Sequence, residues 1–308
     1  MKLFDLHCDT IGECYLQKQE LFENRLHLDL KRGAGFSAWS QCFAIWIPDE
    51  LRGQAALDYF KAVSQTYMAE SEKNKLRLSR CLQSGDITEA EQAGKCAALL
   101  TVEGGGILAG NLNNIPFLQS CGVRMLTLTW NGSCEIGDGA MVEHPKGLTA
   151  FGRQAIPALE AHGIVIDVSH ASEPLFYDVA EIAQKPLIAS HSNAKGVCGH
   201  PRNLTNAQIA EICKRDGLIG LNFYPLFLTE RTTATTEDIV RHAEYMLAMG
   251  AQNALALGSD FDGAELPKDM TGIESMGVLF ERFLQLGYSE SLVNAIFYEN
   301  AHKFFVSL

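Results

Sequence analysis

The sequence predicts an α/β fold, a (β/α)₈ TIM barrel with additional C-terminal helices, and three observations support this prediction. Eight short apolar runs, rich in Val, Ile, Leu or Phe, alternate with segments that have helical spacing. Apolar residues on consecutive positions are typical of parallel strands buried on both faces. Histidines and carboxylates end several of these runs, and the strand ends of a closed barrel all meet at one rim.

The predicted strands and helices alternate along the whole chain. The strands cover about residues 2–7, 36–47, 96–102, 123–130, 163–169, 186–190, 217–224 and 253–259. Helical spacing is found in the intervening segments 51–82, 107–118, 152–162, 174–184 and 236–249. The segment 272–305 predicts two more helices that close the outer ring. We expect one domain covering residues 1–308, because no linker or internal repeat divides the chain.

Several helix ends can be predicted from single residues. Thr205 predicts a helix start, since Gln208 three residues later would complete a capping box. Thr236 predicts a second start, because threonine is a favoured N-cap. Glycines that follow helical segments predict the helix ends. They are Gly163, Gly217 and Gly250.

An open doubly wound sheet is the alternative fold. It would place ligands in one crevice where the strand order reverses. Reactive residues that end the first, third, fifth, sixth and eighth runs could not all reach such a crevice. A closed barrel brings them together, so the reactive residues favour the barrel.

Composition and charge exclude some function classes. The net charge of −12 argues against nucleic acid or an anionic membrane as the main partner. Nine cysteines are spread along the chain with no Cys-x-x-Cys pair, which predicts free thiols in a reducing cytoplasm. No stretch approaches the roughly 20 apolar residues of a membrane span. The first residues lack a signal-peptide pattern, so we expect a cytoplasmic location.

Six metal-binding or acidic side chains lie at the ends of predicted strands. Residues i and i+2 of a strand face the same way, so the first run presents an imidazole and a carboxylate together. Three imidazoles and several carboxylates at one rim predict a metal site, with two ions. The sixth group, an aspartate that ends the last strand, would reach a metal-bound water. The groups are His7, Asp9, Glu103, His170, His191 and Asp260.

Each of these residues also has a simpler interpretation. A lone His-x-Asp or a lone histidine at a strand end is more often structural, and only the combination favours ligands. Gly104, Gly106 and Ala109 fit a degenerate dinucleotide-binding loop, but no acidic residue ends the next strand. Arg202 is either a solvated loop cation or a bidentate clamp for a carboxylate. The sequence has no Gly-x-Ser-x-Gly elbow, Walker loop or His-Glu-x-x-His helix.

Motifs over nearly the whole chain resemble those of the zinc-dependent membrane (renal) dipeptidases and their soluble bacterial relatives, within the amidohydrolase-like metal barrels. The motifs occur jointly and in the same order, which makes the resemblance specific. They are Asp5-Leu6-His7-Cys8-Asp9-Thr10, Glu103-Gly104-Gly105, Leu126-Thr127-Leu128-Thr129, Asp167-Val168-Ser169-His170, Ser190-His191-Ser192, Arg202-Asn203, Gly220-Leu221-Asn222-Phe223-Tyr224 and Gly258-Ser259-Asp260-Phe261-Asp262-Gly263.

The resemblance implies two Zn²⁺ ions and a role for each predicted ligand, with other divalent metals as an open alternative. His7 and Asp9 would hold one zinc ion. His170 and His191 would hold the other. Glu103 would bridge both ions, where many related barrels use a carboxylated lysine.

The resemblance also implies catalytic and substrate-binding residues. Asp260 would handle the proton of the bridging water, Arg202 would bind the substrate's terminal carboxylate, and Tyr224 would line the pocket. This chain departs from the pattern at Trp130, where the renal enzyme has a histidine that assists the scissile carbonyl. Tryptophan donates one N–H and carries no proton, so carbonyl polarisation would depend on zinc or on another donor such as Asn131.

The sequence therefore predicts a cytoplasmic metallo-dipeptidase whose partner is a small dipeptide. Homodimerisation is expected only by analogy with the family. Hydrolysis of another small amide, lactam or ester on the same barrel is the alternative function. A non-catalytic metal or peptide binder is the third, and the presence of all six strand-end groups argues against it.

Overall fold

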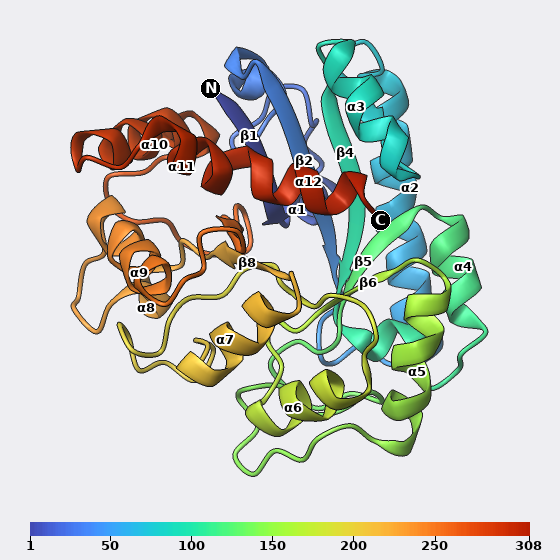
Figure 1. Cartoon of the computed structure of the whole chain (residues 1–308). Coiled ribbons are helices and arrows are strands. Elements are labelled where there is room, and N and C mark those ends of the chain that lie inside the picture. Colours follow the sequence, from blue (N-terminus) through green and yellow to red (C-terminus); the bar gives the residue numbers. More distant parts are fainter.

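The computed structural model describes all residues 1–308, and it contains a closed barrel of parallel strands surrounded by helices (Figure 1). The ring closes because the strand at Ala38–Trp46 pairs with the strand at Lys2–Cys8 on one side and with the strand at Cys96–Glu103 on the other. The predicted TIM barrel is thus confirmed. Its eight strands are β1 (Lys2–Cys8), β2 (Ala38–Trp46), β4 (Cys96–Glu103), β5 (Val123–Thr127), β6 (Val165–Asp167), β7 (Ile188–Ala189), β8 (Leu218–Leu221) and β9 (Leu255–Leu257).

The helices occupy most of the predicted segments. No helix is both long and apolar enough to cross a membrane. The α-helices are α1 (Thr10–Gln17), α2 (Gln54–Lys73), α3 (Ser84–Gln92), α4 (Asn114–Ser120), α5 (Ala150–Ala161), α6 (Glu173–Ile182), α7 (Asn206–Lys214), α8 (Pro225–Leu228), α9 (Thr236–Ala248), α10 (Met276–Gln285), α11 (Glu290–Asn294) and α12 (Asn300–Val306). Short 3₁₀ turns are η1 (Arg32–Gly35), η2 (Gly105–Leu108) and η3 (Ile273–Ser275), and η4 (Ala295–Glu299) is a π-helix.

A ninth strand, β3 (Leu78–Arg80), was not predicted. The helical prediction for 51–82 is wrong beyond Lys73, where α2 ends. The three residues of β3 pair with the start of β4, at Cys96–Ala98, before the pairing of β4 with β5 begins at Leu100. The strand β3 therefore forms because this part of the edge of β4 is free for pairing. No local sequence pattern predicts such a free edge.

The predicted helix ends are partly correct. Thr205 caps α7 in a capping box, and its backbone N–H donates to the side chain of Gln208 at 2.8 Å. The N-cap of α9 is Thr235 and not Thr236, which lies in the first turn. Gly163 and Gly250 follow their helices with φ of 69° and 91°. At the third predicted stop, Asp216 adopts the left-handed conformation (φ 54°) in place of Gly217; a Cβ on Gly217 would lie 2.1 Å from the carbonyl oxygen of Leu187.

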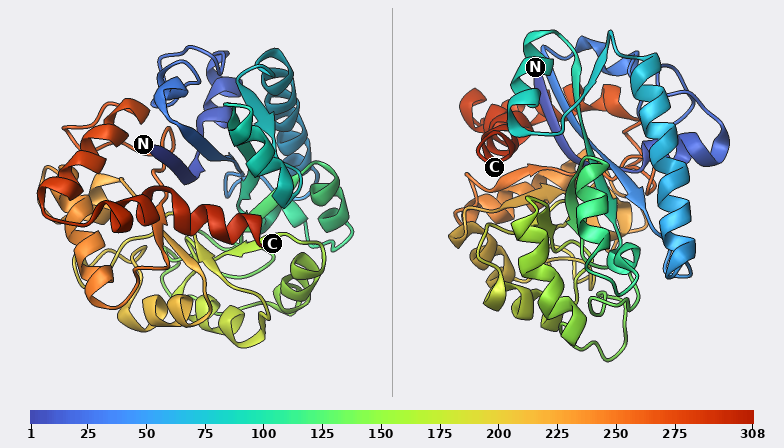
Figure 2. Two further views of the ribbon diagram at one scale, coloured as in Figure 1. Left: turned by 45° about the horizontal axis from the view of Figure 1, so that its top comes forward. Right: turned by 90° about the vertical axis from the view of Figure 1, so that its right-hand side faces the viewer.

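The C-terminal segment was predicted to close the outer ring, but its last part takes a different course. From α11 through η4 to α12 it crosses the amino-terminal end of the barrel (Figure 2). There the ring of Phe305 stacks on Phe4 of β1, with centroids 5.3 Å apart. Both side chains belong to a cluster of 17 buried residues that fills the barrel interior. The C-terminal segment therefore covers part of this end, and the strand-end side chains meet at the opposite, carboxyl-terminal rim.

Candidate metal centre

The structure brings all six predicted strand-end groups together at the carboxyl-terminal rim. Glu103 is the last residue of β4, and the others lie in or just after β1, β6, β7 and β9. A β-bulge in β1 contributes to this convergence, because the three steps from Asp5 to Cys8 oppose only two steps of β2. Bulges reorient side chains next to active sites. This bulge lets Leu6 join the barrel interior while His7, the next residue, also reaches the rim.

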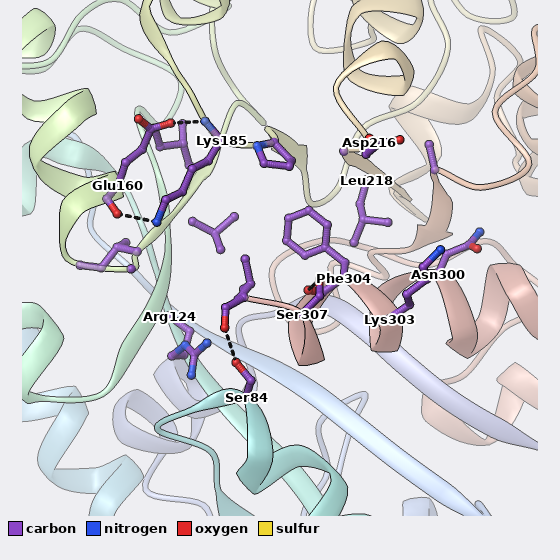
Figure 3. A pocket seen from close by; sticks show the side chains of 18 of the residues that line it. Ser84, Arg124, Glu160, Lys185, Asp216, Leu218, Asn300, Lys303, Phe304 and Ser307 are labelled. Carbon is purple, nitrogen blue, oxygen red and sulfur yellow. Dashed lines mark hydrogen bonds between the residues drawn. The ribbon is translucent and has the colours of Figure 1, made fainter.

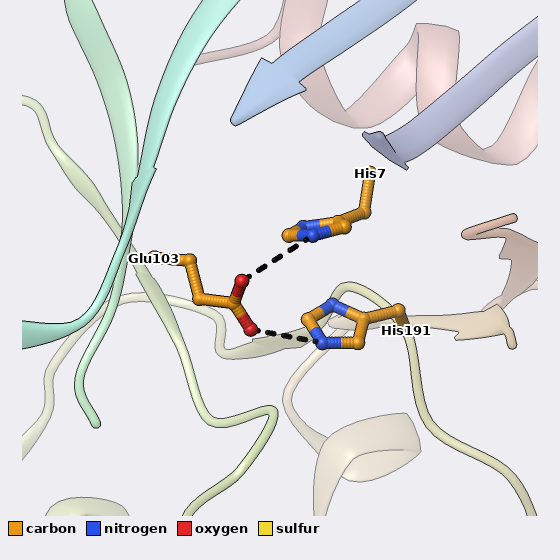
Figure 4. A group of neighbouring side chains, drawn as sticks. All are labelled: His7, Glu103 and His191. Atoms are coloured by element: carbon orange, nitrogen blue, oxygen red, sulfur yellow. Dashed lines mark ion pairs between the residues drawn. The ribbon is translucent and has the colours of Figure 1, made fainter. Parts of the chain in front are cut away.

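Glu103 lies between two sets of ligand atoms (Figure 4). Its Oε2 is 3.7 Å from Nε2 of His7. Its Oε1 is 2.8 Å from Nε2 of His170 and 3.4 Å from Nε2 of His191. One carboxylate therefore faces a first-strand ligand with one oxygen and a pair of histidines with the other, which is the arrangement a bridging ligand requires.

The second set of ligand atoms surrounds His7. Its Nε2 lies 3.2 Å from Oδ2 of Asp9 and 3.8 Å from Oδ1 of Asp260. The ligand atoms of His7, Asp9 and Asp260 all lie within 4.8 Å of one another, and so do those of His7, Glu103 and His191. Two overlapping groups of this kind can hold two neighbouring ions.

Unsatisfied atoms show that these residues fit metal ions. Nδ1 of His7 and Oδ1 of Asp9 are buried without a hydrogen-bond partner. Nε2 of His170 lies 2.9 Å from Nε2 of His191, so two nitrogens that favour metals face each other. A Cβ on Gly263 would come within 2.1 Å of Oδ2 of Asp9, so only glycine leaves room beside this carboxylate.

The crowding of charge changes the pKa values of the predicted ligands. Burial raises the pKa of Glu103 well above its usual value, against the opposing effect of His7. Burial alone would lower the pKa of His7, but the carboxylates of Asp9, Glu103 and Asp260 outweigh it and raise this pKa to about 10. Burial lowers the pKa of His170 well below its usual value, so its imidazole is neutral. Divalent cations would replace the protons that these groups otherwise share.

A buried aspartate supports His191, one of the predicted ligands, and sequence reasoning assigned it no role. Asp167 accepts hydrogen bonds from Oγ1 of Thr127 at 2.6 Å and from Oγ of Ser190 at 2.5 Å. Oγ of Ser190 is in turn 2.8 Å from Nδ1 of His191. This series of hydrogen bonds fixes the imidazole ring of His191, whose Nε2 faces the site. The signal in the sequence was an aspartate inside the strand three residues before His170, much as Asp5 lies two residues before His7.

The predicted substrate-binding residues occupy different parts of the rim. Oδ1 of Asn131 is 3.0 Å from Nδ1 of His170, so its oxygen orients a predicted ligand, and the substrate-donor role of its NH₂ group stays a prediction. The ring of Trp130 lies 6.4 Å from that of His170. Tyr224 follows β8, and its ring packs edge-on against Phe227 at 4.9 Å.

Arg202 is buried and is not the solvated loop cation of the simpler interpretation. Only 4% of the residue is exposed, and its guanidinium lies over the ring of Phe227 at 5.2 Å. Nη2 donates to the carbonyl oxygen of His191 at 3.4 Å, while Nε has no partner. No carboxylate forms an ion pair with it. Burial lowers the pKa of Arg202 to about 10, against the opposing effects of Glu103 and Asp260, so the group is cationic at neutral pH and suited to an anionic ligand.

Asn222 is a site residue that sequence reasoning missed. It follows the last residue of β8, and its Nδ2 donates to Oδ2 of Asp260 at 2.9 Å and to the carbonyl oxygen of His191 at 3.3 Å. Asn222 thus fixes one oxygen of Asp260, and Oδ1 of Asp260 is the oxygen that lies toward His7. The rule that strand ends supply the site would have selected it.

Comparisons with known proteins agree with this site. The family model for membrane dipeptidases (peptidase family M19) matches residues 1–307. An uncharacterised Klebsiella pneumoniae protein is 34% identical over 236 residues, 73% of this chain and 86% of its own. Human dipeptidase 3 is 26% identical over 88% of this chain and 55% of its own.

Two solved structures share nearly the whole fold. The crystal structure of an M19 metallopeptidase, the dipeptidase AC, has a TM-score of 0.93 at 26% identity and covers 99% of this chain and 98% of its own. A Rhodobacter sphaeroides metallopeptidase liganded with a phosphinate mimic of the dipeptide L-Ala-D-Ala has a TM-score of 0.92 at 25% identity, with the same coverage.

Proposed function

Because the chain belongs to the membrane dipeptidase family (peptidase family M19), a family of metal-dependent hydrolases that act on peptide bonds, we propose that it is a zinc-dependent dipeptidase. Its substrates would be dipeptides with a free C-terminal carboxylate, cleaved at a centre of two metal ions. The single observation that carries this proposal is the position of Glu103 between His7 on one side and His170 and His191 on the other.

The metal centre would be held by the rim residues alone. His7 and Asp9 would hold one ion, His170 and His191 the other, and Glu103 both. When bound, two zinc ions supply Lewis acidity and a water molecule activated for attack at neutral pH. Ser190 and Asn131 would keep the two histidine rings oriented for binding, since each contacts the Nδ1 of one ring.

Asp260 would move the proton during the reaction. Asn222 holds its Oδ2, which leaves Oδ1 directed toward the metal-binding groups. Burial raises the pKa of Asp260, which favours a carboxylate that can take up a proton and return it to the leaving amine.

Arg202 would select short substrates by pairing with a free α-carboxylate. A buried guanidinium with an unpartnered Nε offers a positive charge, which a carboxylate can pair with and a neutral internal peptide bond cannot. Tyr224 would line the same side of the pocket, because both side chains contact Phe227.

Metal content and a substrate panel test this proposal together. Elemental analysis of the protein after chelation and zinc reloading should give two ions per chain. L,L- and L,D-dipeptides should be hydrolysed, and the matching dipeptide amides should react at least about tenfold more slowly in kcat/KM because they lack the carboxylate. Faster hydrolysis of lactam or phosphoester controls, or a single tightly bound ion, would contradict the proposal.

A further inference from the structure

Two tryptophans stand together beside the metal centre, and the proposed reaction gives them no role. Trp46 ends β2, and Trp130 follows β5. Their rings meet edge to face, with centroids 4.9 Å apart and planes at 65°. Both side chains are partly exposed, so the pair forms part of the surface next to His170 and not of the core.

The sheet register directs Trp46 into the mouth of the barrel. Trp46 is in register with Glu103 on the neighbouring parallel strand, so both side chains project from the same face. The Nε1 of Trp46 is buried without a hydrogen-bond partner. The wall therefore presents a large apolar surface, and the N–H of Trp46 is not paired within the protein.

The strand order places this wall across the mouth from Arg202. The tryptophans flank β4, since β2 and β5 are its neighbours in the ring. The guanidinium of Arg202 lies over the ring of Phe227, and Phe227 belongs to α8, which follows β8. In the ring of eight strands, β8 is four strands away from β4. A dipeptide whose carboxylate lies at Arg202 would extend its amino-terminal residue across the metal centre toward the tryptophans.

We propose that Trp46 and Trp130 form the pocket wall for the side chain of the amino-terminal residue, and that they select large apolar or aromatic side chains there. This inference rests on the proposed dipeptidase function. An aromatic pair stabilises an apolar or aromatic substrate side chain by burying it and by edge-to-face contact. It offers no charge to a polar side chain. Trp130 would thus determine specificity at the position where the renal enzyme has a histidine.

Two matched dipeptide series test the inference. One varies the amino-terminal residue (Gly-Ala, Leu-Ala, Phe-Ala), and the other varies the carboxyl-terminal residue (Ala-Gly, Ala-Leu, Ala-Phe). The zinc-loaded wild-type protein should prefer Phe-Ala over Gly-Ala by about tenfold or more in kcat/KM. In Trp130→Ala this ratio should fall toward one, and the Ala-Phe to Ala-Gly ratio should stay unchanged. Binding of phosphinate mimics of Phe-Ala and Gly-Ala, measured by calorimetry, should change in the same way.

The control variant is Trp39→Phe, which alters a buried tryptophan at the other end of the same strand β2. It should keep the wild-type ratio. An amino-terminal ratio that survives in Trp130→Ala, or an equal change in both series, would overturn the inference. Hydrolysis of no dipeptide by the wild-type protein would instead refute the proposed function, so the two failures are distinguishable.

Discussion

The two ends of the barrel differ in how their polar groups are satisfied. A cavity of about 930 Å³ lies at the amino-terminal end beside α12 (Figure 3). Several of its charged groups are paired within the protein: Oε1 of Glu160 accepts the backbone N–H groups of Gln184 and Lys185, and Nζ of Lys185 donates to the carbonyl oxygen of Glu160. Nη1 of Arg124 donates to the carbonyl oxygen of Leu82.

At the carboxyl-terminal rim the opposite holds. His7, Asp9, Trp46 and Arg202 each keep a buried polar atom without a partner, whereas no such atom lines the amino-terminal cavity. Buried polar groups are normally paired, so a cluster of unpaired ones marks a place that a ligand completes. Empty volume alone is thus a weaker sign of the reaction site than convergent groups with altered pKa values.

The largest effect that would sharpen this contrast is expected for Asp260→Asn. The amide keeps the shape of the side chain and its contact with Asn222, but it cannot accept the proton. We expect kcat to fall about 10²–10⁴-fold with two zinc ions still bound. The measurements are steady-state kinetics on a dipeptide and elemental analysis.

Asp262→Asn is the matched control for Asp260→Asn. Asp262 accepts hydrogen bonds from Oγ1 of Thr10 and the backbone N–H of His27, both at 2.6 Å, so it holds the loop and does not face the ligands. It should lower stability and leave kcat nearly unchanged. Loss of zinc from Asp260→Asn would show that this residue is a ligand and not the proton carrier.

A stability effect without a catalytic effect is expected at the other end, for Phe305→Ala. Phe305 is fully buried against Phe4, and truncation leaves a cavity. The free energy of unfolding should fall by about 3–5 kcal/mol, as urea denaturation would measure. Zinc content and kcat/KM of the folded protein at 25 °C should stay at the wild-type values. A change in metal content would mean that the covered end and the rim are coupled.

A smaller effect is expected for Ser190→Ala, which removes the link between Asp167 and Nδ1 of His191. The ring would lose its fixed orientation, so zinc affinity should weaken about 10–100-fold in a competition assay with a chelator. Ser192→Ala is the control, because Oγ of Ser192 contacts only Oγ of Ser169, at 3.4 Å. Equal affinities of the two variants would contradict the role of Ser190.

The features that the sequence predicted are those that local pattern and barrel geometry determine together. Glu103, His170 and His191 end or follow apolar runs, and a parallel barrel allows such ends only one meeting place. Their convergence therefore followed without knowledge of any contact. The roles assigned to them, and to Asp260 and Arg202, rest on chemistry and resemblance and remain to be tested.

The features that the sequence did not predict depend on distant parts of the chain. The bulge in β1 exists relative to β2, and β3 exists because part of the edge of β4 is free. The course of α12 depends on the packing of Phe305 against Phe4, which lies about 300 residues earlier in a chain of 308. Asn222, after β8, has its role through one hydrogen bond to Asp260, which follows the neighbouring strand β9. None of these partners can be identified from a local window.

The smallest effect is expected for Arg124→Met, at the wall of the amino-terminal cavity. Methionine keeps the apolar part of the side chain, and the loss of one hydrogen bond to Leu82 should lower the free energy of unfolding by only about 1 kcal/mol. Dipeptide kcat/KM should change by less than about twofold, since surface and peripheral changes leave a preorganised site intact. A tenfold change in kcat/KM would break the comparison, because an arginine on the far side of the barrel interior would then be acting on the metal centre. The same assay on Arg202→Met, where the guanidinium lies among the rim groups, supplies the reference for a large effect.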